Sequence, residues 1–170
     1  FISVCGGVFC TYFPQAFEGK CDYILRGEGD EVVPELMDLI EQGKDGHHLM
    51  NVHPNPMRPA MNVNTLPPTD HTIFDERSLY RPFQGKIIKI ATVETQRGCP
   101  FKCKFCNSPS NAALYKGETD SLFFRKRTVQ HQEEEIIDLI EKHDIEVLWI
   151  VTDTFLTMSK KGFDEWAEMY

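Results

Sequence analysis

The sequence predicts an α/β protein in two parts, separated by a proline-rich segment. Residues 1–44 alternate strand-like and helical patterns in the order β-α-β-α, and this periodicity lapses over residues 45–85. Residues 86–170 then return to strands and helices. Such alternation is typical of parallel sheets covered by helices. We therefore expect the C-terminal part of a doubly wound sheet at residues 1–44, a linker at 45–85, and the first strand-helix units of a second domain at 86–170.

The first part opens with an apolar run and a glycine pair. Residues 2–8 indicate a buried parallel strand that ends at Gly6 and Gly7. Glycines at such a place let a ligand or a helix approach the backbone closely. A short helix is expected over residues 13–19.

A second strand and a clearer helix complete this part. The strand is expected over residues 22–26. Apolar residues then recur at helical spacing over residues 32–40, with Asp30 expected to cap the start and Gly43 to end the helix. In open sheets of this class, ligands bind at the carboxyl ends of the strands.

The linker is rich in proline and histidine. It contains six of the ten prolines and four of the six histidines. Because these histidines have no paired spacing, we expect solvated side chains there and no metal site.

The second part begins with a strand at residues 87–95, rich in Ile, Val and Thr. Residues 108–117 predict a loop or a short helix. An amphipathic helix is expected over 129–140, a strong strand over 145–151 and a further helix over 163–170.

Three cysteines follow the first strand of this second part as Cys-x3-Cys-x2-Cys, at Cys99, Cys103 and Cys106. Three thiolates on one loop suit a zinc site or an iron-sulfur cluster. Zinc would need a fourth protein ligand, and no second Cys or His pair is found. A 4Fe-4S cluster held by three cysteines leaves one iron open for a small molecule, and the spacing favours this interpretation. The other cysteines are expected to be small buried residues without chemistry: Cys5, Cys10 and Cys21.

The motif formed by Cys99, Cys103, Phe105 and Cys106 resembles the signature of the radical S-adenosylmethionine (SAM) enzymes. The flanking residues 97–100 and 107–109 resemble the branch with a cobalamin-binding domain in front. The resemblance implies that three cysteines hold three irons and that the fourth iron chelates SAM. Reductive cleavage of SAM would then release a 5'-deoxyadenosyl radical.

The resemblance also implies roles for residues outside the loop. Phe105 would lie near the adenine of SAM, and Asp153, at the carboxyl end of the strand 145–151, would hold its amino group. The alternative for Asp153 is a turn or helix-capping aspartate. Gly6 and Gly7 would lie against cobalamin. The fold implied is the end of a Rossmann-like cobalamin-binding domain followed by the start of a radical SAM partial TIM barrel, and thus a fragment of a longer protein.

The function implied is methyl transfer to an unactivated carbon of a small-molecule substrate. A cobalamin-associated radical cyclase or rearrangement enzyme is the alternative, and a zinc or redox-sensing binding module is the alternative from a different class. Release of 5'-deoxyadenosine together with S-adenosylhomocysteine would distinguish methyl transfer from the other two.

Charge and composition bear on partners and location. The net charge of -8 argues against nucleic acid as a partner. Residues 86–127 nevertheless carry nine Lys or Arg against three Asp or Glu. This local positive charge is either a solvated face or a docking site for an acidic electron donor such as flavodoxin or ferredoxin. No transmembrane segment is predicted, and a thiolate cluster fits a reducing cytoplasm.

Overall fold

The computed structural model describes residues 1–170, which divide into two compact units. The first comprises Phe1–Met61 with Ala113–Leu122, and the second comprises Asn62–Ala112 with Phe123–Tyr170. Both combine helices with strands, and the sheets include parallel and antiparallel pairs. The predicted α/β class is confirmed at this level.

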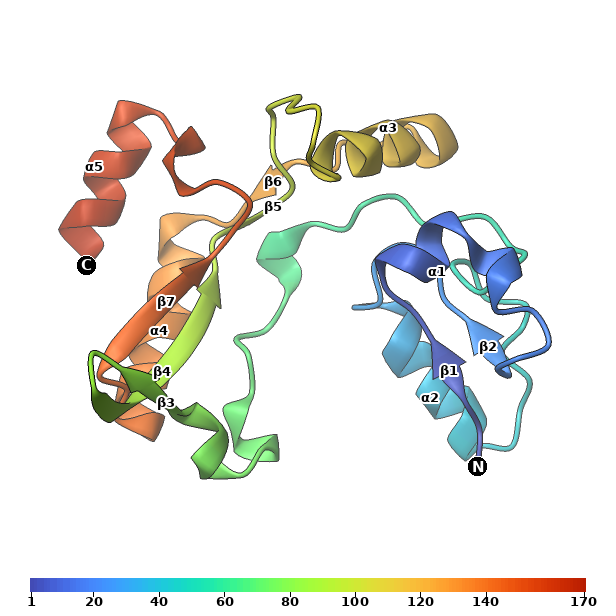
Figure 1. The fold of residues 1–170 in the computed structure, drawn as a ribbon, viewed down its shortest axis with the longest axis horizontal. Helices are drawn as coiled ribbons and strands as arrows, with labels where there is room; N and C mark the ends of the chain where they lie inside the picture. The colour runs from blue at the N-terminus through green and yellow to red at the C-terminus, as the bar shows by residue number, and fades with distance from the viewer. The chain divides into compact units, whose positions relative to one another are not determined.

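The first unit is organised around a parallel pair of short strands (Figure 1). Strand β1 (Val4–Cys5) pairs with β2 (Tyr23–Ile24), and helices α1 (Val8–Tyr12) and α2 (Val32–Glu41) belong to the same unit. The predicted strand 2–8 is therefore parallel but shorter than expected, and it is not buried, since Val4 is 39% exposed. The apolar core consists of Tyr23, Leu25, Val32, Leu36, Leu49 and Val52.

The helix expected at residues 13–19 was wrongly placed. The α-helical residues are those of α1, which begins directly after Gly7, and residues 14–16 form only a 3-10 turn. The physical reason lies in the glycine and the proline that flank α1. Gly7 has a φ of 93°, which ends the strand. Pro14 lacks the N–H that would continue the ladder of α1.

Of the two predictions for the ends of α2, the one for the start is wrong and the one for the end is confirmed. Asp30 is not the N-cap, because that position falls on Glu31, whose side chain makes no capping hydrogen bond. Gly43 ends the helix as expected, with a φ of 67°. The N–H groups of Gly43 and Lys44 donate to the carbonyl oxygens of Ile40 and Leu39, which is a Schellman motif.

The second unit contains a three-stranded sheet in the order β3-β4-β7 (Figure 1). Strand β3 (Tyr80–Phe83) runs antiparallel to β4 (Lys86–Glu94), and β7 (Val147–Val151) runs parallel to β4 on its other side. Helix α4 (Val129–His143) packs on one face of this sheet. A small buried cluster joins them, made of Ala91, Val93, Ile136 and Leu139.

The second unit also contains a pair of short strands and a C-terminal helix. Strands β5 (Gln96–Arg97) and β6 (Arg125–Lys126) form an antiparallel pair. Helix α5 (Lys160–Met169) ends the chain, with the Ser159 side chain capping its start. None of its residues is fully buried. No helix of the structure has the length and apolar character that crossing a bilayer would require.

Strand β3 was not predicted. Residues 45–85 also hold an isolated antiparallel bridge from Val52 to Leu25 and three 3-10 turns, Val63–Thr65, His71–Ile73 and Glu76–Leu79. Pro82 lies within β3, and a proline normally argues against a strand. The strand forms because it lies at the edge of its sheet, where a residue without an N–H is tolerated.

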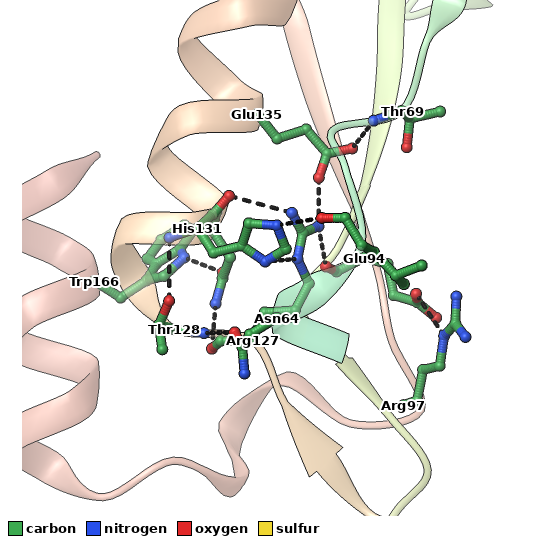
Figure 2. A network of polar contacts seen from close by, with 11 residues as sticks. Asn64, Thr69, Glu94, Arg97, Arg127, Thr128, His131, Glu135 and Trp166 are labelled. Atoms are coloured by element: carbon green, nitrogen blue, oxygen red, sulfur yellow. Dashed lines mark hydrogen bonds and ion pairs between the residues drawn. The ribbon is translucent and has the colours of Figure 1, made fainter. Parts of the chain in front are cut away.

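A buried polar network lies at the carboxyl end of β4 (Figure 2). Arg127 forms an ion pair with Glu135, and both side chains are more than nine-tenths buried. The Arg127 guanidinium also donates to the backbone oxygen of Glu94 at 2.8 Å and to Nδ1 of His131 at 3.1 Å. Because Nδ1 accepts that bond, neutral His131 carries its proton on Nε2. Nε2 then donates to the carbonyl oxygen of Leu66 at 2.7 Å.

The network therefore joins four segments of the second unit: the end of β4, the residues before α4, α4 itself and residues 64–69. Thr69 N–H donates to Glu135 at 3.3 Å, and the Asn64 side chain accepts from the backbone N–H of Thr128 at 2.7 Å. Removing one member leaves other buried polar groups without partners.

We predict that Arg127→Met lowers the free energy of unfolding of the full-length protein by about 3–5 kcal/mol, because Glu135 would remain buried and unpaired. Denaturant unfolding measures this change. In the double variant R127M/E135L most of the loss should be recovered. As a matched control, K161M removes the exposed pair Lys161–Glu165 and should change stability by no more than about 0.5 kcal/mol. A double variant as unstable as R127M would contradict this explanation.

Candidate functional site

The three motif cysteines lie on a loop at the carboxyl end of β4. The chain leaves β4 at Glu94, forms β5, and passes through residues 98–107 before α3 (Ser108–Thr119) begins. The loop tightens where Cys106 N–H donates to the carbonyl oxygen of Cys103 at 3.1 Å. The sequence is therefore folded as expected around the motif, with a strand on one side and a helix on the other.

The thiols of this loop are free and accessible. Cys103 and Cys106 are exposed and Cys99 is half-buried. The N–H of Ser108 donates a hydrogen bond to the Cys106 sulfur, 3.4 Å away. The structure contains no group of three or more His, Cys, Asp or Glu side chains arranged around a single metal ion. Cysteines that hold a cubane cluster bind different iron atoms, so the donor set fits such a cluster without meeting at one point.

Gly98 is required by the start of the loop. Its φ is 79°, which side chains rarely adopt. A Cβ atom at this position would also lie 2.9 Å from the backbone oxygen of Phe123 and 2.8 Å from an atom of its ring. The residue before Cys99 therefore has to be glycine for the loop to leave β5 in this direction.

Asp153 lies beside the start of α3. Its carboxylate accepts a hydrogen bond of 3.0 Å from the hydroxyl of Ser108, which is the first residue after the cysteine loop. Ser108 is buried, whereas Asp153 is exposed. Asp153 does not cap the following 3-10 turn, because that N-cap is Thr154. The structure thus brings Asp153 next to the cysteine loop, although 45 residues separate it from Ser108.

Phe105 projects from the same loop and is 95% exposed. A phenyl ring so open to solvent has no packing role in this chain and is available to a ligand.

Sequence reasoning missed Ser108 and Gln96. Gln96 is buried, and its side-chain amide donates to the carbonyl oxygen of Thr154 while its amide oxygen accepts from the Thr157 hydroxyl at 2.9 Å. It thereby ties β5 to the segment that follows β7. The only signal was a polar residue directly after an apolar strand, which also occurs in ordinary turns.

Positive side chains surround the loop. Lys102 and Lys104 are exposed within it. Arg97 pairs with Glu94 at 2.9 Å, and Lys126 donates to the carbonyl oxygen of Thr157 at 2.7 Å. The two loop lysines give this end of the sheet a positive surface, which favours anionic groups.

The predicted glycine pair lies in the first unit, directly after β1. A Cβ atom added at Gly7 would meet no atom within 4 Å, so the backbone there faces open space. Two hydrogen bonds of the Thr11 side chain stabilise the turn. The hydroxyl donates to the Gly7 oxygen at 2.9 Å and accepts from the N–H of Gly27 at 3.0 Å. Gly6 lies against Leu25, and its Cβ would be at 3.7 Å from that side chain.

The chain is similar in sequence to several known proteins. No family model matches the chain. An uncharacterised methyltransferase of Pyrococcus horikoshii is 27% identical over 95% of this chain and 35% of its own length. The anaerobic magnesium-protoporphyrin IX monomethyl ester cyclase of Rubrivivax gelatinosus is 27% identical over 98% of this chain and 31% of its own length.

A solved structure shows the same fold. TsrM of Kitasatospora setae, a radical SAM methyltransferase, aligns with 97% of this chain and 32% of its own at a TM-score of 0.56 and 18% identity. It has been solved with cobalamin and a 4Fe-4S cluster bound. The chain is therefore similar in fold to a radical SAM methyltransferase. It spans about a third of the length of the curated relatives named here.

We predict that Gly98→Ala prevents assembly of the cysteine loop, because the new Cβ would overlap the backbone of Phe123. Iron bound per chain in anaerobically purified full-length protein should fall severalfold. Gly117→Ala, in α3, is the matched control: a Cβ there meets nothing within 4 Å, and alanine is the better helix former by about 1 kcal/mol. Normal iron content in G98A would show that the backbone at Gly98 does not shape the loop.

Proposed function

We propose that the protein containing this chain is a cobalamin-dependent radical SAM methyltransferase that acts on an unactivated carbon of a small molecule. The proposal is carried by one observation. Cys99, Cys103 and Cys106 lie on an accessible loop at the end of β4, and Asp153, at the end of the neighbouring parallel strand β7, is hydrogen-bonded to the first residue after that loop. In strand-helix barrels, residues at the carboxyl ends of strands form the active site.

The residues present fit a 4Fe-4S cluster with SAM. Cys99, Cys103 and Cys106 would hold it as thiolates, and the soft sulfur donors suit iron. When bound, the cluster supplies the electron for reductive cleavage of SAM. Asp153 would accept a hydrogen bond from the amino group of SAM, and the exposed ring of Phe105 would stack near the adenine.

Cobalamin would be held by the first unit. Gly6 and Gly7 follow a parallel strand, and the open space at Gly7 allows a large planar ligand to contact the backbone there. The Thr11 hydroxyl keeps this turn in place through its bonds to Gly7 and Gly27. TsrM, whose fold matches, has been solved with cobalamin bound, which supports the assignment.

An acidic electron donor is the partner that the local charge favours. Lys102 and Lys104 are exposed on the cysteine loop itself, so a donor such as flavodoxin or ferredoxin would dock where the distance to the cluster is short. This step belongs to a reducing compartment, and we assign the protein to the cytoplasm on that ground.

A cyclase is the second candidate, because three of the curated relatives are anaerobic magnesium-protoporphyrin IX monomethyl ester cyclases. Other relatives are a hopanoid C-3 methylase and a bacteriochlorophyllide d C-8(2)-methyltransferase. Both candidates use the same cysteine loop and differ in whether a methyl group leaves SAM.

Product analysis distinguishes the two. Full-length protein with reductant, SAM and candidate substrates should yield 5'-deoxyadenosine together with S-adenosylhomocysteine. We predict that alanine at Cys99, Cys103 or Cys106 abolishes cleavage and lowers bound iron. Deoxyadenosine without S-adenosylhomocysteine would support the cyclase, and zinc without iron in the purified protein would refute both candidates. C21A, outside the loop, is the control that should retain cleavage.

The role of Asp153 is tested by affinity. Asp153→Ala should weaken SAM binding by about 10-fold or more, since a hydrogen bond to a charged group is worth about 1.5–3 kcal/mol. Ser108→Ala should weaken it less, because it only frees the orientation of the carboxylate. Both variants should keep normal iron content. Asp164→Ala, on the exposed side of α5, serves as the control. Unchanged affinity in D153A would return Asp153 to a structural role.

A further inference from the structure

Three cysteines outside the cysteine loop gather in the first unit. The sulfur atoms of Cys5 and Cys10 lie 3.1 Å apart, although neither the strand β1 nor the helix α1 alone would bring them together. The thiol of Cys21 lies 3.5 Å from the carbonyl oxygen of Tyr23, in the strand that pairs with β1. The sequence had suggested small buried residues. Only Cys10 is buried, Cys5 and Cys21 are half-buried, and the fold places the thiols of Cys5 and Cys10 in contact.

The turn between β1 and α1 creates this contact. Gly7, with its φ of 93°, reverses the chain so that the first turn of α1 returns over the end of β1. Cys10 is 1% exposed, whereas Cys5 remains accessible to about the extent of a half-buried residue. Small reagents therefore reach Cys5 first, with Cys10 directly behind it.

The buried thiol of the pair, that of Cys10, is protonated in the resting form. Burial and the neighbouring thiols raise the pKa of Cys10 to about 11, and burial raises the pKa of Cys21. Cys10 is thus a neutral thiol near pH 7 and packs against Cys5 without charge repulsion. The sulfur atoms of Cys5 and Cys10 are in direct contact, which is the arrangement that disulfide formation requires.

We propose that Cys5 and Cys10 are a reversible disulfide site that responds to low-molecular-weight disulfides such as glutathione disulfide. The thiolate of Cys5 attacks one sulfur of glutathione disulfide, whose S–S bond breaks and releases one glutathione. Cys10 then loses its proton, attacks the Cys5 sulfur and expels the second glutathione. Two protein thiols are oxidised to one disulfide, and glutathione disulfide is reduced to two thiols that take up both protons.

The disulfide would close a small ring around the glycine pair. The ring includes Gly6 and Gly7, so oxidation would fix the turn whose backbone faces open space. This inference concerns thiols of the first unit only, and it does not depend on the activity proposed above.

Peptide mapping tests the proposal directly. Full-length protein, purified anaerobically with its cofactors, is incubated with increasing ratios of oxidised to reduced glutathione, then alkylated and digested with trypsin. Residues 1–19 contain no Lys or Arg, so Cys5 and Cys10 remain in the peptide that ends at Lys20, while Cys21 falls in the peptide Cys21–Arg26. We expect the first peptide to become two hydrogens lighter and to lose both alkyl groups, and dithiothreitol should reverse this.

Variants separate the pair from the third thiol. Cys21→Ala should leave formation of the disulfide unchanged, and Cys10→Ala should leave Cys5 as a glutathione adduct. The proposal is overturned if Cys5 and Cys10 both stay alkylated at every ratio. It is equally overturned if wild-type Cys5 becomes linked to the peptide containing Cys21, or if C21A prevents the disulfide. Because the readout is a peptide mass, loss of enzyme activity has no bearing on it.

Discussion

The buried ion pair between Arg127 and Glu135 is the constraint on which the second unit depends. Two charges with almost no access to water persist only where each is fully hydrogen-bonded. Arg127 meets this requirement by binding the last carbonyl of β4 and two atoms of His131, and its own backbone N–H donates to the oxygen of Thr95 at 3.0 Å. The pair therefore sets where β4 ends, and the chain must leave the sheet there.

The cysteine loop is shaped by that exit. Gly98 adopts a positive φ at the start of the loop, which a residue with a side chain would rarely adopt. At the other end, the hydroxyl of Ser108 donates a hydrogen bond to Asp153, which follows β7. Both ends of the loop are thus fixed to the sheet, while Cys103, Cys106 and Phe105 project freely between them. A site with rigid ends and accessible thiols is suited to receive a preformed inorganic cluster, because little of the backbone has to be reorganised.

The sequence predicted the parts of the fold that local patterns determine. Strand β4 and helix α4 follow strong periodicity in the sequence. Gly43 ends α2 because glycine readily adopts the positive φ of a helix C-terminus. Strand β3 was not predicted because Pro82 argues against a strand. An edge strand tolerates a residue without an N–H, but the edge position is not visible in the sequence. The bond from Ser108 to Asp153 could not be predicted, since it depends on two parallel strands ending side by side. The roles of the cysteines, Phe105, Asp153 and the glycine pair stay predictions from resemblance.

The two sets of three cysteines show why spacing alone is an incomplete guide to thiol chemistry. In the loop at residues 98–107 the regular spacing is visible in the sequence, and two of the three thiols, those of Cys103 and Cys106, are exposed. Cys5, Cys10 and Cys21 have no recognisable spacing, and composition favours small buried residues. The contact between Cys5 and Cys10 arises from the reversal at Gly7, which joins β1 to α1. A buried thiol in contact with a more accessible one combines a protected partner with an entry point for reagents. That combination is a property of the folded turn and is absent from the unfolded chain.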